Sequence, residues 1–235
     1  AAQLKEEFMP KSRKKAEKWL SNIQSDLEKS GTSQDKFVKI HYRPWDYRYT
    51  YYTGKSNGFH ERPRRAVMDH MIAVDGNIGL ISRRQMTGDV PNFFFISDQL
   101  TSDGIIRSDN AGLEKFFPLF IQADLNNKVK KTIKKTNSLE SWKPKNGMIP
   151  NLNHPFTNML SKHLNLVFNP AMKQKKGSIS PIDILYFGYA LFYSNSYRTK
   201  YSDYIMKSFP KLLFHCYQNL QFVYEKVINK LKALL

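Results

Sequence analysis

The side chains with the clearest chemical use in this sequence are arginines gathered in one segment. Of the ten arginines, seven lie between positions 43 and 84. A guanidinium group is planar and rich in N–H donors, so it can hold a phosphate or a guanine edge through two parallel hydrogen bonds. The amides of Gln85 and Asn92, which follow, can pair with an adenine edge in the same way. The candidate contact residues are Arg43, Arg62, Arg64, Arg65, Arg83, Arg84, Gln85 and Asn92.

Each of these arginines has a second interpretation, as a partner in an internal ion pair. Glu61, Asp69, Asp75 and Asp89 lie in the same part of the sequence. For any single residue the two interpretations stay open. The cluster as a whole favours nucleic-acid contact, because a concentrated basic surface is the electrostatic footprint of a nucleic-acid binder.

The charge of the whole chain agrees with a polyanionic partner. Lys and Arg number 37 against 20 Asp and Glu, which leaves a net charge of +17 in 235 residues. Such an excess favours DNA, RNA or an anionic membrane surface. No apolar run approaches the roughly 20 residues of a membrane span, so we expect no membrane partner. The single cysteine, Cys216, cannot form an internal disulfide and indicates a reduced, cytoplasmic protein.

The sequence lacks the motifs of a catalyst. It has no Gly-x-Gly, no adjacent prolines of the kind used by amino-methyltransferases, no Walker loop and no Asp/Glu-x-Lys nuclease signature. One cysteine excludes a multi-cysteine zinc site. The pair His215 and Cys216 lies among apolar residues and fits a helix core better than a nucleophile. We therefore expect no catalytic residue, metal or cofactor in this segment.

The elements that must position the arginines begin with an aromatic strand. Its rings recur at every second position, which is the period of a β-strand: Trp45, Tyr47, Tyr49 and Tyr51. We expect this aromatic face to be buried, and Asp46 to pair with Arg48 on the opposite face. Pro44, which lacks an amide hydrogen, marks the strand start.

The rest of the chain predicts an α+β fold with a mixed, mainly antiparallel sheet followed by helices. We expect a helical connector over residues 1–35, an α+β body over 36–150 and a helical subdomain over 151–235. Helices are predicted over 11–29, 64–73, 156–168, 180–193, 196–209 and from 212; strands are predicted over 37–42, 45–52, 77–81, 92–97 and 116–121. The lysine-rich run over 124–150 indicates a polar connector. Ser180, Pro181 and Asp183 form a helix start.

Two blocks of the sequence resemble a known family. Residues 42–48, YRPWDYR, resemble the Tyr-Arg-Pro-Phe-Asp-x-Arg block of the C-terminal specificity domain in Type ISP restriction-modification enzymes and related adenine-specific DNA methyltransferases. Residues 179–186 and 194–211 are similar to the second signature of that family, although Lys211-Leu212-Leu213 departs from its usual Phe-Pro-Arg-Ile-Pro ending. The signature residues, which we interpret mainly as scaffold, are Tyr42, Pro44, Trp45, Asp46, Arg48, Tyr197, Arg198 and Tyr201.

The resemblance implies a target-recognition domain that binds double-stranded DNA downstream of a methyltransferase domain in the same polypeptide. That methyltransferase would use S-adenosylmethionine to modify adenine, and a restriction endonuclease activity would accompany it in some members. We therefore expect this chain to be a non-catalytic piece of a longer protein. The alternative is a protein-interaction module whose basic helices dock another subunit. Arginines gathered in one open concavity would favour DNA, and arginines dispersed in internal ion pairs would favour the alternative.

Overall fold

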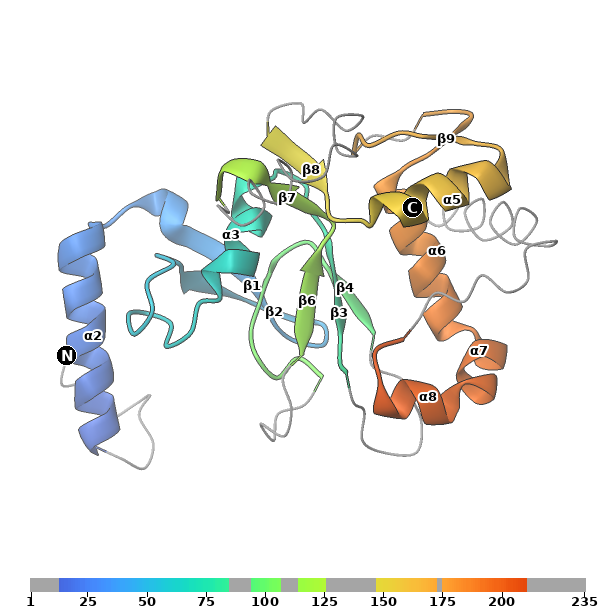
Figure 1. Cartoon of the computed structure of the whole chain (residues 1–235). Coiled ribbons are helices and arrows are strands. Elements are labelled where there is room, and N and C mark those ends of the chain that lie inside the picture. Colours follow the sequence, from blue (N-terminus) through green and yellow to red (C-terminus); the bar gives the residue numbers. More distant parts are fainter. Residues whose placement is uncertain (1–12, 85–93, 107–113, 126–146, 173–174, 211–235) are drawn as a thin grey trace.

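The protein is elongated, with a lone helix at one end and a group of helices at the other (Figure 1). This computed structural model describes residues 13–84, 94–106, 114–125, 147–172 and 175–210. Small sheets lie between the two helical ends. The helix predicted from 212 and most of the lysine-rich run lie outside the described residues. Among the residues that are described, no helix is both long and apolar enough to cross a membrane.

The first sheet has the order β2-β1-β5. Strand β1 (Phe37–Arg43) pairs antiparallel with β2 (Asp46–Tyr51), and the short β5 (Leu100–Thr101) pairs with β1 in parallel. These two strands match the strands predicted over 37–42 and 45–52, the second of them from its alternating rings. A short 3-10 turn, η1 (Gln34–Lys36), leads into β1.

The second sheet has the order β4-β3-β6, and its pairs are antiparallel. Its strands are β3 (Gly79–Ser82), β4 (Phe95–Ser97) and β6 (Lys115–Pro118). Gly79 is required at its position, because a Cβ atom there would lie 2.3 Å from Cζ of Phe116. Helix α3 (Arg65–Ala73) packs Met68 and Met71 onto this sheet together with Leu100 of β5 and Tyr52, which follows β2.

The strand predicted over 116–121 is two strands in the structure. The chain leaves the second sheet after Pro118, and β7 (Phe120–Gln122) then pairs with β8 (Met148–Pro150). The break falls at Leu119, whose amide donates to the carbonyl of Ile78 (2.8 Å). The 3-10 turn η2 (Ala123–Leu125) follows β7. Strand β8 lies within the segment that the sequence predicts to be a connector.

The carboxyl-terminal part is mainly helical, as predicted, with shorter helices than the sequence indicated. Its elements are α5 (His154–Leu164), β9 (Val167–Phe168), β10 (Ser178–Ile179), α6 (Pro181–Tyr193), α7 (Asn195–Lys200) and α8 (Ser202–Lys207). Helix α5 ends where Asn165 adopts a left-handed conformation with φ 50°, which a helix cannot continue. The Ser180–Asp183 start of α6 is confirmed as a reciprocal capping box.

The helices share their core with the sheets. Phe94, which is fully buried, packs with Phe192, Tyr197 and Ile205. The partly buried Ile182 of α6 likewise packs against a cluster that contains Phe120. The α+β class with mainly antiparallel strands is confirmed, whereas the division into segments at residues 35 and 150 stays a prediction.

The carboxylate of Asp26 connects helix α2 (Arg13–Ser30) to the sheet region, and Lys55 and Lys36 donate to carbonyl groups of the same helix. Asp26 is fully buried and accepts hydrogen bonds from Thr53 Oγ1 (2.7 Å), Ser30 Oγ (2.9 Å) and the Phe59 amide (3.2 Å). Burial alone would raise the pKa of Asp26, but these hydrogen bonds and the nearby Lys55 outweigh it and lower that pKa. The loop can approach so closely because residue 58 is glycine, where a Cβ atom would lie 1.9 Å from Asp26 Oδ2.

Candidate nucleic-acid interface

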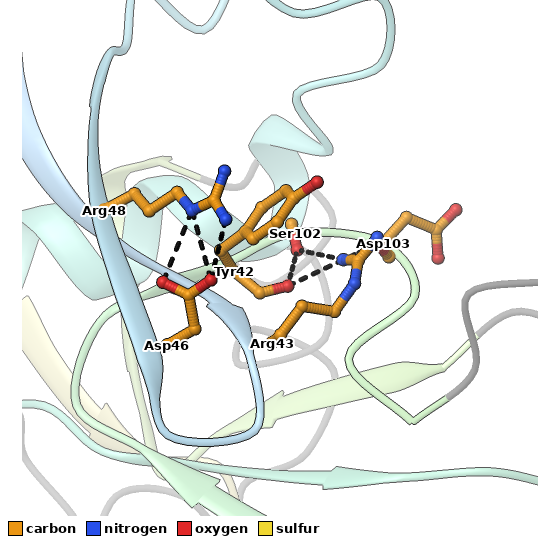
Figure 2. Close-up of polar contacts among 6 residues, drawn as sticks. All are labelled: Tyr42, Arg43, Asp46, Arg48, Ser102 and Asp103. Atoms are coloured by element: carbon orange, nitrogen blue, oxygen red, sulfur yellow. Dashed lines mark hydrogen bonds and ion pairs between the residues drawn. The ribbon is translucent and has the colours of Figure 1, made fainter.

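The β1–β2 hairpin places two guanidinium groups on one tyrosine ring (Figure 2). Cζ of Arg48 lies 3.9 Å from the ring centroid of Tyr42, and Cζ of Arg43 lies 4.3 Å from it. Arg48 also pairs with Asp46, with 2.9 Å between Nη2 and Oδ2. The predicted pair is therefore present, although it is exposed to solvent on the hairpin surface. Exposed pairs contribute only about 0–1 kcal/mol.

Arg43 ties this hairpin to the loop after β5. Its Nη1 donates to the Tyr42 carbonyl (2.7 Å), to Ser102 Oγ (3.4 Å) and to the Asp103 carbonyl (3.3 Å). Of the predicted contact residues, Arg43 is thus the one most engaged in holding its own hairpin. Its role in DNA contact stays a prediction.

The aromatic face of the hairpin is exposed, which corrects our expectation of a buried one. Trp45 is 88% exposed, and Tyr47 and Tyr49 are 42% and 76% exposed. Trp45 does not extend β2: it lies in the turn with φ 61°. Strand β2 is an edge strand, and no described residue covers most of this face. Tyr51 alone is buried, and its hydroxyl donates to the Gly31 carbonyl (2.9 Å).

The second signature block makes contacts within the helical part, as a scaffold role predicts. Tyr197 is buried and packs against the rings of Phe192 and Tyr201, with centroids 6.0 Å and 5.2 Å away. Arg198 Nη2 donates to the Tyr193 carbonyl (3.2 Å) and to Asn195 Oδ1 (3.0 Å). These contacts hold the junction between α6 and α7.

Three of the predicted arginines meet in one concave surface, which we call the cationic hollow. It has a volume of about 500 Å³. Its walls are Ser56, Arg62, Arg64, Arg65, Ala66, Val67, Met68, Lys115 and Phe116. Four of these side chains are cationic and none is a carboxylate. Such a surface is suited to a phosphate group.

The start of helix α3 forms one wall of the cationic hollow. Arg64 adopts a left-handed conformation with φ 51°, and the helix begins at the next residue. No side chain caps this end of the helix. Amide groups at a helix start carry partial positive charge and lack intrahelical acceptors. Helix α3 therefore adds to the attraction that the side chains exert on an anion.

The arginines of the cationic hollow differ in how they are held. Arg62 is exposed and has no hydrogen bond or ion pair with another described residue. Arg64 donates from Nη1 to the Glu114 carbonyl (3.2 Å), and its Nη2 lies 3.4 Å from Asp103 Oδ2. Arg65 pairs with Asp69 at 2.9 Å while its side chain stays 66% exposed. The ion-pair interpretation thus holds in part for Arg64 and Arg65, although both side chains still line the cationic hollow.

The other predicted contact residues lie elsewhere. Arg83 is only 4% exposed, so little of its side chain is accessible to a ligand. Arg84, which lies just after β3, is exposed. Gln85 and Asn92 lie outside the described residues. Lys115 belongs to the cationic hollow and was missed, because only the pairing of β6 with β3 brings it near, at register with Ser82. No signal in the sequence reveals that pairing.

A second, larger hollow adjoins the cationic one and shares Arg62, Arg64 and Met68 with it. Its volume is about 760 Å³, and its walls include the carboxylates of Glu61 and Asp103. Burial raises the pKa of Asp103, Arg64 opposes that change, and a hydrogen bond with Glu114 adds to it. These carboxylates make the larger hollow less suited to phosphate than the cationic hollow.

Comparison with known proteins agrees with the sequence signatures. The chain matches the family model of the Type ISP C-terminal specificity domain over residues 1–221. No curated protein matches it. Its structure is similar to a chain of the cryo-EM structure of a DrdV-DNA complex, with a TM-score of 0.52 and 16% sequence identity. That similarity covers 83% of this chain and 16% of the other chain, and at such identity it establishes a shared fold. Because the family model spans nearly the whole sequence, the chain belongs to the family of Type ISP C-terminal specificity domains.

Proposed function

We propose that this domain selects the DNA target of a restriction-modification enzyme and that the cationic hollow holds phosphates of the bound duplex. The observation that carries the second part is the meeting of Arg62, Arg64, Arg65 and Lys115 at the start of α3, with no carboxylate in the walls. The membership of the chain in a specificity-domain family supports the first part. The solved relative of similar fold is described as a DNA complex, which supports it further.

The positions of the side chains indicate which would contact phosphates and which would contact bases. Phosphate contacts fix the register of a protein on a duplex, and contacts with base edges choose the sequence. The cationic hollow would supply the register. Arg84, which is exposed beside the segment that contains Gln85 and Asn92, would lie where base edges are read. The clustering of three arginines in one concavity favours this function over a protein-interaction module.

The activity of the whole enzyme is a wider proposal. The chain spans 16% of the length of the solved relative, so other domains would complete the protein. We propose an upstream methyltransferase domain in the same polypeptide that uses S-adenosylmethionine to modify adenine, with restriction endonuclease activity as a further property. This segment would contribute the choice of site and no catalysis, and its membership in a specificity-domain family supports this role.

Selection from a pool of random duplexes tests the proposed function. The 235-residue chain is incubated with the pool, bound DNA is recovered and sequenced, and the selection is repeated at rising salt. We expect a single short motif to be enriched, because base contacts discriminate by about 1–3 kcal/mol for each base pair. Retention of DNA without any enriched motif would contradict sequence recognition, and no retention would contradict DNA binding itself.

A further inference from the structure

A second concave surface, which we call the aromatic hollow, lies between the hairpin, β4 and α6. It has a volume of about 460 Å³. Its walls are His41, Trp45, Tyr47, Phe95, Ile96, Tyr189 and Tyr193. Six of these seven residues carry an aromatic ring, and none carries a full charge at neutral pH when His41 is neutral. A hollow of this size and composition is suited to a flat, mostly apolar ligand.

Rings of the aromatic hollow contact one another and leave part of their surface exposed to solvent. Tyr47 stacks on His41 with centroids 4.5 Å apart and planes at 20°. Trp45 meets Phe95 edge to face at 6.2 Å and is otherwise exposed. Large exposed rings at an edge strand are costly to leave in water unless they serve a contact. The exposed faces of Trp45 and Tyr47 therefore require an explanation.

His41 supplies the polar part of this surface. It is only 3% exposed, and its ring nitrogens make no hydrogen bond of normal geometry with a described residue, although the backbone of Arg43 interacts with the ring. Buried polar atoms are nearly always paired in folded proteins, and the exceptions mark sites of ligands, water or ions. Burial lowers the pKa of His41, with Asp98 and the backbone of Arg43 opposing the change, so at neutral pH the ring is neutral and has one donor and one acceptor.

We propose that the aromatic hollow takes up one unstacked nucleobase of the bound DNA. This inference rests on the proposed function, because the base is supplied by the duplex that the cationic hollow holds. Every base has a π-face that stacks on aromatic side chains and an edge with both donors and acceptors for the nitrogens of His41. Lys39, whose Nζ lies 4.9 Å from the ring centroid of Tyr47, would supply a cation for the adjoining phosphate.

Duplexes with one unpaired base test this inference. The full chain is titrated onto a paired duplex and onto duplexes of the same sequence with a single-nucleotide bulge, and binding is followed by fluorescence anisotropy. An unpaired base needs no energy to leave its pair, so a protein that binds it outside the helix prefers the bulged form. We expect the bulged duplex to bind about tenfold more tightly.

Three variants decide whether the aromatic hollow is responsible. Tyr47→Ala should abolish the preference for the bulge, while Tyr49→Ala, on the same strand and outside the hollow, should keep it. His41→Phe keeps a ring against Tyr47 but removes both nitrogens, so it should keep a preference for the bulge that is weaker than that of the wild-type chain. Thermal melting of each variant identifies any that fails to fold.

The outcomes separate this inference from the function on which it rests. Equal binding of paired and bulged duplexes by the wild-type chain would overturn the inference and leave DNA recognition standing. A preference that survives Tyr47→Ala in a folded variant would overturn it as well. Failure of the wild-type chain to bind any duplex would overturn both.

Discussion

Asp103 and Arg64 form an ion pair at the boundary between the two adjoining hollows, with 3.4 Å between Asp103 Oδ2 and Arg64 Nη2. Asp103 lines the larger hollow, and Arg64 lines both. The carboxylate therefore neutralises part of the charge that the cationic hollow offers to a phosphate. It also holds the guanidinium in place, together with the carbonyl of Glu114.

Replacing this carboxylate should strengthen DNA binding. In Asp103→Asn, Arg64 keeps a neutral neighbour and offers its full charge to a phosphate. We expect a higher affinity and a salt dependence of log K that is steeper by up to about 0.9, the value for one additional neutralised phosphate. Anisotropy titrations at several salt concentrations measure both quantities.

Asp46→Asn is the matched control, because it makes the same change in net charge on the hairpin, outside the cationic hollow. It should increase affinity less than Asp103→Asn does. Equal effects of the two substitutions would mean that net charge alone governs binding, and would contradict a specific role for Arg64.

The buried histidines predict that the fold loses stability in mild acid. Burial lowers the pKa of His41, His60 and His70 below the usual 6.5, and the neutral ring of His70 accepts a hydrogen bond from the Gln122 amide (3.1 Å). The unfolded chain therefore takes up protons at a higher pH than the folded chain. Stability is fully present above about pH 6.5 and is lost as the pH falls through the lowered pKa values.

Urea unfolding at pH 7.5 and pH 5.5 measures this loss. We expect a smaller free energy of unfolding at the lower pH, and a smaller difference between the two conditions for His70→Asn, whose side chain retains an acceptor but does not titrate. A wild-type stability that is the same at both pH values would contradict the burial of neutral histidines.

The contact between Gly58 and Asp26 predicts a non-additive pair of substitutions. In Gly58→Ala the new methyl group would clash with the Asp26 carboxylate, and overpacking of this kind costs about 1–3 kcal/mol. In an Asp26→Ala background the carboxylate is gone and the nearest remaining atom is Cβ of residue 26 at 3.2 Å, so the same substitution should cost less. Urea unfolding of the four proteins gives the coupling energy. Additive losses would show that α2 is not fastened to the loop through Asp26.

Local signals in the sequence were sufficient for the elements that depend on near neighbours. The rings at every second position indicated β2, and Ser180 with Asp183 indicated the start of α6, because a strand period and a capping box are properties of a few consecutive residues. The gathering of Arg62, Arg64 and Arg65 could be predicted for the same reason: they flank one helix start.

Features that depend on distant pairing could not be predicted. The exposure of Trp45 follows from its place in the turn between β1 and β2, and Lys115 reaches the cationic hollow only through the pairing of β6 with β3. Arg83 and Arg84 are neighbours in sequence, yet one is buried and the other is exposed. Burial at the end of a strand is set by what packs against the sheet, and the sequence of the strand does not contain that information.

The salt dependence of DNA binding by the wild-type chain and by Arg62→Ala/Lys115→Ala tests the central claim most directly, with Arg48→Ala as the control for a paired arginine outside the cationic hollow. We predict that log K falls linearly with log salt, and that the double substitution lowers the slope by about 0.9 for each phosphate that the variant no longer neutralises. Arg48→Ala should leave the slope nearly unchanged. A double variant that binds with the wild-type slope and affinity would contradict the assignment of phosphate binding to the cationic hollow.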